Sequence, residues 1–122
     1  MEFIQESGYS IRLGKEEEFQ RWLEANEDRL AKAYPKGCEY IGTFVVVSTS
    51  EKTAGGWRTL ERLDSYGAQD RLAAAAKDTK STFHKLWREA AAFFDPAREA
   101  HWSQTLVKRA TDASIWDIPS ED

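Results

Sequence analysis

The sequence predicts an α+β fold in which helices pack on one face of an antiparallel sheet. The strongest observation is a central hairpin, because the apolar run from Ile41 to Ser48 is joined by polar residues to a second run that begins at Gly55-Gly56 and ends at Leu63. One amphipathic helical pattern precedes this hairpin and another follows it. A chain of 122 residues has room for one hydrophobic core, so we expect one domain over residues 1–110 and a tail over residues 111–122.

The first predicted element is a strand over residues 2–12, where apolar and polar side chains alternate and one face holds Phe3, Tyr9 and Ile11. Gly14 ends this strand, and the acidic residues 16–18 favour the start of a helix of about 20 residues. Apolar side chains recur along this helix at helical spacing: Phe19, Trp22, Leu23, Leu30, Ala33 and Tyr34. Pro35 and Gly37 end it.

The two strands of the hairpin differ in their side-chain patterns. Residues 45–47 are too continuously apolar to face water on either side, so we expect both faces of the first strand to be covered. One face is predicted to hold Tyr40, Phe44 and Val46, and the other Ile41, Val45 and Val47. On the second strand, Arg58 and Arg62 share one face, whereas the other face holds Trp57, Thr59, Glu61 and Leu63.

Two helical stretches follow the hairpin. The alanine-rich residues 66–76 predict a helix whose exposed N–H groups can be capped by Asp64 or Ser65. Residues 81–94 repeat apolar side chains at helical spacing and predict a second helical stretch that ends before Pro96.

A last strand over residues 102–109 completes the order strand, helix, strand, strand, helical segment, strand. This is the split βαβ order of a ferredoxin-like fold, with a four-stranded antiparallel sheet covered by helices on one face. The other face would then expose a large apolar patch. We expect a second copy of the chain to cover it, which gives a homodimer through the sheet face.

Composition limits the classes of partner. The 17 basic and 21 acidic residues give a net charge of −4, and the basic residues are scattered, so the patch typical of a nucleic-acid-binding protein is missing. Cys38 is the only cysteine, which excludes an intramolecular disulfide and a multi-thiolate metal site. No run approaches the roughly 18 apolar residues that span a bilayer, so we expect no membrane partner and a cytoplasmic location.

Three segments resemble the dimeric α/β-barrel superfamily: residues 13–19 after the first strand, the central hairpin, and residues 62–66, which lead into an alanine-rich helix. This superfamily includes cofactor-free antibiotic-biosynthesis monooxygenases, haem-degrading monooxygenases, stress-responsive barrel proteins and NIPSNAP-like proteins. The resemblance covers about residues 1–110 and is nearest to the NIPSNAP-like branch, through the strand-three aromatic, the acidic residue before the second helix and the aromatic helix that follows. It implies that two sheets pack face to face into a barrel, with ligands between the sheet and the helices of each subunit.

The sequence resembles the haem-degrading branch only in part. Those enzymes use an asparagine on the first strand and a histidine on a later helix, whereas the first strand here has no asparagine. Only His84 could correspond to the histidine on the later helix. A solvent-facing or structurally hydrogen-bonded histidine is favoured over an iron ligand at this position. We therefore expect no haem or other cofactor and no metal site.

Three polar residues conflict with their surroundings in the predicted fold. Asn26 falls on the apolar side of the long helix, so its amide either bonds a neighbouring backbone group or lines a cleft between helix and sheet and orients a ligand. If the face of Arg58 and Arg62 lines the barrel, at least one charge is interior. That interior arginine then needs a counter-ion such as Glu6, or it forms an anion site for a substrate carboxylate.

The sequence leaves two main functions open, and whether the protein is an enzyme is not decided. The first is the binding of a small hydrophobic or aromatic ligand between helices and sheet. The alternative is a cofactor-independent monooxygenase that binds an aromatic substrate dry and deprotonates it before oxygen reacts. A purely structural role in assembly is a third possibility. No catalytic residue is assigned, and the candidate ligand-binding residues are Asn26, Tyr9, Trp57, Arg58, Arg62, Trp87 and His84.

Overall fold

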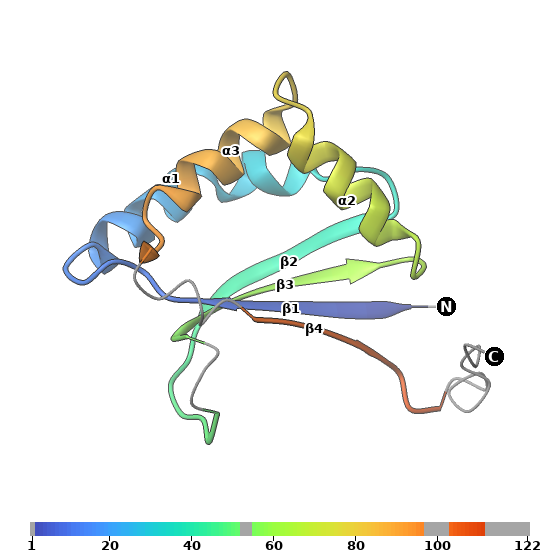
Figure 1. The fold of residues 1–122 in the computed structure, drawn as a ribbon, viewed down its shortest axis with the longest axis horizontal. Coiled ribbons are helices and arrows are strands. Elements are labelled where there is room, and N and C mark those ends of the chain that lie inside the picture. Colours follow the sequence, from blue (N-terminus) through green and yellow to red (C-terminus); the bar gives the residue numbers. More distant parts are fainter. Residues whose placement is uncertain (1, 52–54, 97–102, 112–122) are drawn as a thin grey trace.

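The computed structural model describes residues 2–51, 55–96 and 103–111. In these residues the chain forms the strands β1 (Phe3–Tyr9), β2 (Cys38–Val45), β3 (Trp57–Leu63) and β4 (Ser103–Lys108), and the helices α1 (Glu16–Ala33), α2 (Ala68–Lys77) and α3 (Thr82–Ala91). The strands form one antiparallel sheet in the order β2-β3-β1-β4, and the helices lie over one face of it (Figure 1). The predicted α+β, ferredoxin-like fold is confirmed.

The observed ends of the elements differ only slightly from the predicted ones, except in the hairpin, where β2 begins and ends earlier than expected. Trp102 and nearly all of the predicted tail lie outside the described residues. None of the described helices has the length and the apolar character that a membrane span requires.

The two central strands place alternate side chains against the helices. Gln5 of β1 pairs with Glu61 of β3, and Ser7 pairs with Thr59. All four of these side chains are buried on the helix-facing side of the sheet. The intervening residues of β3, which include Arg58 and Arg62, face away from the helices, as the alternation in the sequence predicts.

A bulge in β2 makes one sequence prediction wrong. Tyr40 lies opposite Glu61, but Gly42 already lies opposite Leu60, so one extra residue is inserted between them. Tyr40 therefore faces the helices, whereas Phe44, which lies opposite Arg58, faces the other side of the sheet. The two aromatic residues do not share a face as predicted. Nor is the end of this strand covered within one chain, since Val45 and Val47 are 57% and 98% exposed.

The two later helices begin differently. Neither Asp64 nor Ser65 caps α2, because the helix begins at Ala68 and no side chain bonds its first N–H groups. Asp64 instead forms an ion pair with Arg71, with 2.7 Å between Oδ1 and Nη2. In contrast, α3 has a side-chain cap, since the Ser81 hydroxyl accepts a hydrogen bond from the backbone N–H of the third helical residue.

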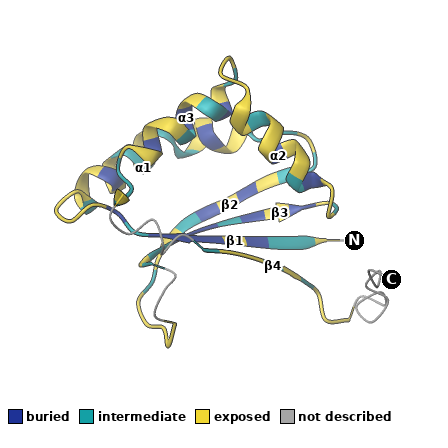
Figure 2. Cartoon of the chain, viewed as in Figure 1, coloured by how far each residue is buried: buried dark blue, intermediate teal, exposed yellow. Residues whose placement is uncertain are grey.

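The buried residues lie where the helices meet the sheet (Figure 2). This core is rich in aromatic side chains. Phe19 of α1 is fully buried. Its ring lies 5.1 Å from that of Trp57 and 5.4 Å from that of Phe93. Three leucines are also fully buried, namely Leu30, Leu63 and Leu86. This packing fixes α1 and α3 over β1 and β3.

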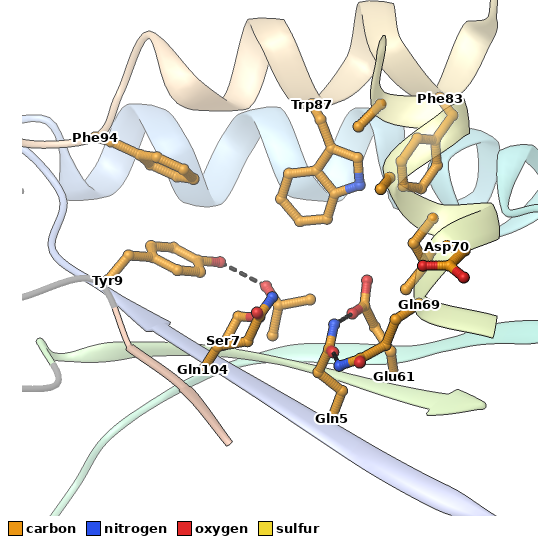
Figure 3. Close-up of a pocket in the computed structure, with 14 residues that line it drawn as sticks. Gln5, Ser7, Tyr9, Glu61, Gln69, Asp70, Phe83, Trp87, Phe94 and Gln104 are labelled. Carbon is orange, nitrogen blue, oxygen red and sulfur yellow. Dashed lines mark hydrogen bonds between the residues drawn. The ribbon is translucent and has the colours of Figure 1, made fainter. Parts of the chain in front are cut away.

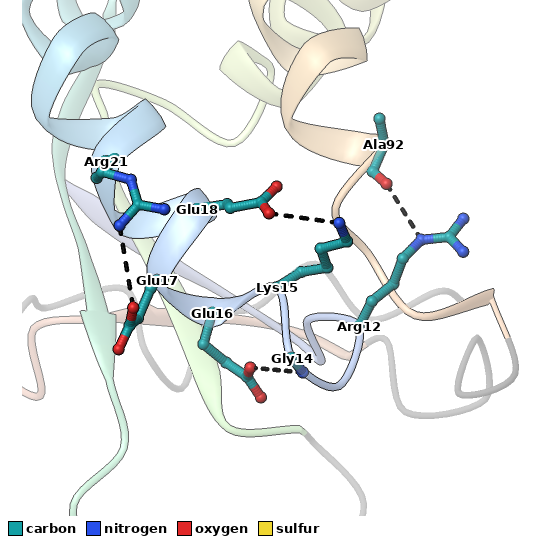
Figure 4. A network of polar contacts seen from close by, with 8 residues as sticks. All are labelled: Arg12, Gly14, Lys15, Glu16, Glu17, Glu18, Arg21 and Ala92. Carbon is teal, nitrogen blue, oxygen red and sulfur yellow. Dashed lines mark hydrogen bonds and ion pairs between the residues drawn. The ribbon is translucent and has the colours of Figure 1, made fainter.

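The chain that follows α3 returns to the end of β1. Arg12 donates its backbone N–H to Phe93 O at 2.8 Å and its Nε to Ala92 O at 3.2 Å (Figure 4). An isolated bridge beside this contact brings the ring of Phe94 to 4.5 Å from that of Tyr9. The return of the chain thus places an aromatic side chain over the helix-facing side of β1.

Candidate functional site

An open cavity of about 540 Å³ lies between the sheet and the helices α2 and α3 (Figure 3). This volume is within the range of about 300–1,000 Å³ that is common for small-molecule sites. Because the exposed side chain of Gln104 on the edge strand β4 lines the cavity, the cavity opens over this edge of the sheet. The lining comprises Gln5, Ser7, Tyr9, Thr59, Glu61, Gln69, Asp70, Leu72, Ala73, Ala76, Phe83, Trp87, Phe94 and Gln104.

The cavity has one polar wall and one largely apolar wall. The polar wall is the sheet, from which β1 and β3 present Gln5, Ser7, Tyr9, Thr59 and Glu61. The facing wall comes from the helices and the segment after α3, and includes the rings of Phe83, Trp87 and Phe94 (Figure 3). Such walls suit a flat apolar molecule that carries polar groups on one edge.

Glu61 is the charged residue of the polar wall and is only 6% exposed. Gln5 Nε2 donates to its Oε1 at 2.8 Å, and the hydroxyl of Tyr34 donates to its Oε2. Gln69 of α2 in turn donates its Nε2 to Gln5 Oε1 at 2.6 Å. Burial raises the pKa of the Glu61 carboxyl, and the two hydrogen bonds lower it in part. The same two hydrogen bonds hold the carboxyl group in a fixed position beside the cavity.

A chain of hydroxyl groups leads from the cavity toward α1. The hydroxyl of Tyr9 lies 2.7 Å from Thr59 Oγ1, which lies 3.1 Å from Thr43 Oγ1. That oxygen is 2.6 Å from the hydroxyl of Tyr40, which donates to Glu27 Oε2 at 2.7 Å. Burial raises the pKa of Tyr9 to about 12, so its hydroxyl keeps its proton at neutral pH.

Burial of Glu61 predicts a dependence of stability on pH. Its pKa is higher in the folded chain than in the unfolded chain, where it is about 4.3, so the folded state binds the proton more tightly. The resulting contribution to stability is complete below the unfolded value and is lost as pH rises through the folded value. We expect urea unfolding to show that the wild type loses stability relative to Glu61→Gln as pH rises from about 4.3 toward neutrality.

The exposed rim residue Asp70 offers the control for this experiment. Asp70→Asn also removes one carboxyl group, but from an exposed position, and therefore serves as the matched change of charge. A stability difference between wild type and Glu61→Gln that stays constant over the same range would contradict the burial of the Glu61 carboxyl.

Of the residues that the sequence indicates, Tyr9 and Trp87 line the cavity. Trp57 pairs with Tyr9 across the sheet and packs on Phe19, beside the cavity and outside its lining. Asn26 lies outside it as well, where its Nδ2 donates to Trp22 O at 2.9 Å. The amide of Asn26 thus has the neighbouring backbone partner that the first of its two interpretations required.

The remaining three candidates also lie away from the cavity lining. His84 places Nδ1 at 2.6 Å from the backbone oxygen of Ala76, which joins α3 to α2. The described residues contain no group of three or more His, Cys, Asp or Glu side chains that could hold a metal ion. Arg58 and Arg62 lie on the opposite face of the sheet. There Arg62 pairs with Glu2 at 3.0 Å and Glu39 at 2.6 Å, and not with the suggested Glu6.

The sequence analysis did not select most of the polar wall, namely Gln5, Ser7, Thr59 and Glu61, or the neighbouring Gln69 of α2. A signal for the strand residues was present. Gln5 and Ser7 interrupt the face of β1 that also holds Tyr9, and Thr59 and Glu61 interrupt the corresponding face of β3. Polar residues on the core side of two neighbouring strands must bond one another or face a cavity.

The fold is shared with solved structures. A NIPSNAP family protein from Agrobacterium tumefaciens strain C58 superposes with a TM-score of 0.64 at 14% identity, over 90% of this chain and 87% of that chain. A dimeric ferredoxin-like protein of unknown function from Jannaschia sp. CCS1 gives a TM-score of 0.61 at 12% identity, over 89% and 100% of the two chains. An antibiotic biosynthesis monooxygenase-like protein from Nitrosomonas europaea gives 0.51 at 16% identity, over 88% and 98%.

Comparisons of sequence give no match, either with protein-family models or with curated proteins. At the identities above, the structural likeness establishes the fold alone. The chain therefore has a ferredoxin-like fold, and NIPSNAP proteins are among the structures similar to it.

Proposed function

We propose that the protein binds a small molecule with a flat aromatic body in the cavity between the sheet and the helices α2 and α3. The observation that carries this proposal is the pairing of the two walls, in which the rings of Phe83, Trp87 and Phe94 face polar side chains on β1 and β3. Stability alone favours filling such a space with apolar side chains, because interiors are close-packed and voids cost free energy. An open polar and aromatic cavity is therefore better explained by a ligand.

Ser7 supports the same proposal. Its side chain is only 6% exposed and lines the cavity on the polar wall. A hydroxyl group there can donate a hydrogen bond to a bound molecule and accept one from it.

The test uses N-phenyl-1-naphthylamine, a neutral fluorescent probe with flat aromatic rings. We expect one site per chain, and we expect Ser7→Phe to weaken binding by at least about tenfold because the new ring would fill part of the cavity. Ser50→Phe, at an exposed residue that follows β2, is the matched control and should change affinity by less than about twofold. Failure of the wild type to bind, or equal binding by both variants, would refute the proposal.

We also propose that two copies pair through the open sheet face, which we define by Ile4, Phe44, Leu60 and Val107. Phe44 and Val107 are 48% and 52% exposed, which is costly for a chain on its own. The same side of the sheet carries Arg62 and its two acidic partners, so opposite charges are available when this surface meets itself. The Jannaschia protein of the same fold is described as dimeric. The pair would form a dimeric α/β barrel.

Light scattering at micromolar concentration tests this assembly. The expected species has twice the chain mass of 13.9 kDa. A species of one chain mass at that concentration would count against the open sheet face as an interface between copies.

A cofactor-independent monooxygenase is the second candidate function, and Glu61 is the observation that favours it. A general base needs a carboxylate in a protected site with a pKa nearer to neutrality, and burial moves the pKa of Glu61 in that direction. Such an enzyme would consume oxygen when given a hydroquinone without added metal, and Glu61→Gln would lose turnover while still binding the neutral probe. A hydroquinone that binds without oxygen uptake would leave ligand binding as the function.

A further inference from the structure

The hydroxyl chain that begins at Tyr9 has a direction that its last member fixes. The Glu27 carboxylate can only accept, so Tyr40 donates its single proton to it. Thr43 must then donate to Tyr40, and Thr59 to Thr43, because each hydroxyl has one proton. Tyr9 therefore donates to Thr59. Its proton is committed, so its oxygen can only accept a hydrogen bond from a molecule in the cavity.

Glu61 also offers acceptor capacity to this space. A carboxylate has about four acceptor positions, and Gln5 and Tyr34 each use one. Since Glu61 lines the cavity, a donor on a bound molecule can reach the carboxylate from that side. Both Tyr9 and Glu61 thus favour a ligand that donates hydrogen bonds.

The charges around the cavity have one sign. Glu61 and the rim residue Asp70 are acidic, whereas none of the described residues that line the cavity is Lys, Arg or His. An anionic ligand would lose its water without gaining a counter-charge, which is strongly unfavourable. A cation would gain the carboxylate and, in addition, the negative faces of rings such as that of Trp87.

We infer that the ligand is an aromatic molecule with a protonated amine, whose N–H groups donate to Glu61 while its ring packs against Trp87. The inference rests on the proposed function and narrows it to one class of ligand, because shape alone would admit cationic, neutral and anionic aromatics. A charge-assisted hydrogen bond in a site of low dielectric constant is stronger than one in water. Charge should therefore decide which aromatic molecules the cavity retains.

The test compares three indoles that share one ring system and differ in charge at neutral pH: tryptamine (cation), tryptophol (neutral) and indole-3-acetate (anion). In calorimetric titrations of the full chain, tryptamine should bind about ten- to a hundredfold more tightly than tryptophol, and indole-3-acetate should bind least. Glu61→Gln should bring the affinity for tryptamine down to that for tryptophol. Glu24→Gln, which makes the same change at an exposed residue of α1 outside the cavity lining, should change it by less than about threefold.

The outcomes separate this inference from the proposed function. Equal affinities for the three indoles, or an unchanged preference for tryptamine in Glu61→Gln, would overturn the inference while leaving binding in the cavity intact. Failure of all three indoles, with N-phenyl-1-naphthylamine still bound, would also overturn it. Failure of that probe as well would refute the proposed function. Glu61→Asp keeps the charge on a shorter side chain, so it should still prefer tryptamine to indole-3-acetate.

Discussion

Gly55→Ala is expected to destabilise the folded chain by at least about 3 kcal/mol. Gly55 has a φ of +76°, where a residue with a side chain loses about 1–2 kcal/mol. The new Cβ would also lie 2.3 Å from Tyr9 O and 2.4 Å from the carbonyl carbon of Tyr9. Because these are backbone atoms, the clash can be relieved only by moving β1 or the β2–β3 loop. Tyr9 lines the cavity, so ligand binding should weaken in parallel.

The neighbouring glycine provides the matched control. A Cβ added to Gly56 would meet nothing within 4 Å, and this residue is not held at positive φ, so Gly56→Ala should stay within about 0.5 kcal/mol of the wild type. Urea unfolding measures both variants, at one protein concentration because the stability of an oligomer depends on concentration. Equal stabilities of the two variants would show that Gly55 does not lie in close contact with the backbone carbonyl of Tyr9.

Most of the fold could be predicted because local patterns determine its elements. The alternation in β1, the acidic first turn of α1 and the helical spacing of aromatic residues in α3 each depend on a few neighbouring residues. The bulge in β2 could not be predicted in the same way. One extra residue between Tyr40 and Gly42 reverses the side on which Phe44 lies, and only the pairing with β3 reveals it.

The cavity was harder to predict because its polar wall combines distant parts of the chain. Gln5 meets Glu61 only because β1 and β3 pair in one register, and Gln69 reaches Gln5 only because α2 packs over that pair. Spacing alone made Asn26 a candidate, since it places the amide on the apolar side of α1. The bond from Asn26 to the carbonyl of Trp22, one turn earlier, satisfies that amide locally.

Leu60→Asp is expected to convert the proposed dimer into a monomer. Leu60 lies within the open sheet face, where it pairs with Glu6 on one side and Gly42 on the other. In the dimer an aspartate there would be desolvated beside Glu6, at a cost of about 3–5 kcal/mol. That cost raises the dissociation constant by more than about a hundredfold. Light scattering over a dilution series measures the change, and the variant should show one chain mass.

Leu13→Asp is the matched control, because Leu13 is 94% exposed in the turn before α1 and the same chemical change there should leave the mass unchanged. If Leu60→Asp keeps twice the chain mass, the open sheet face is not the contact, and the exposed Val47 beyond β2 becomes the next surface to test. The cavity lies on the opposite side of the sheet from Leu60. A monomeric variant that still binds N-phenyl-1-naphthylamine would therefore show that each chain forms its ligand site without its partner, whereas loss of both properties would make the second copy part of the site.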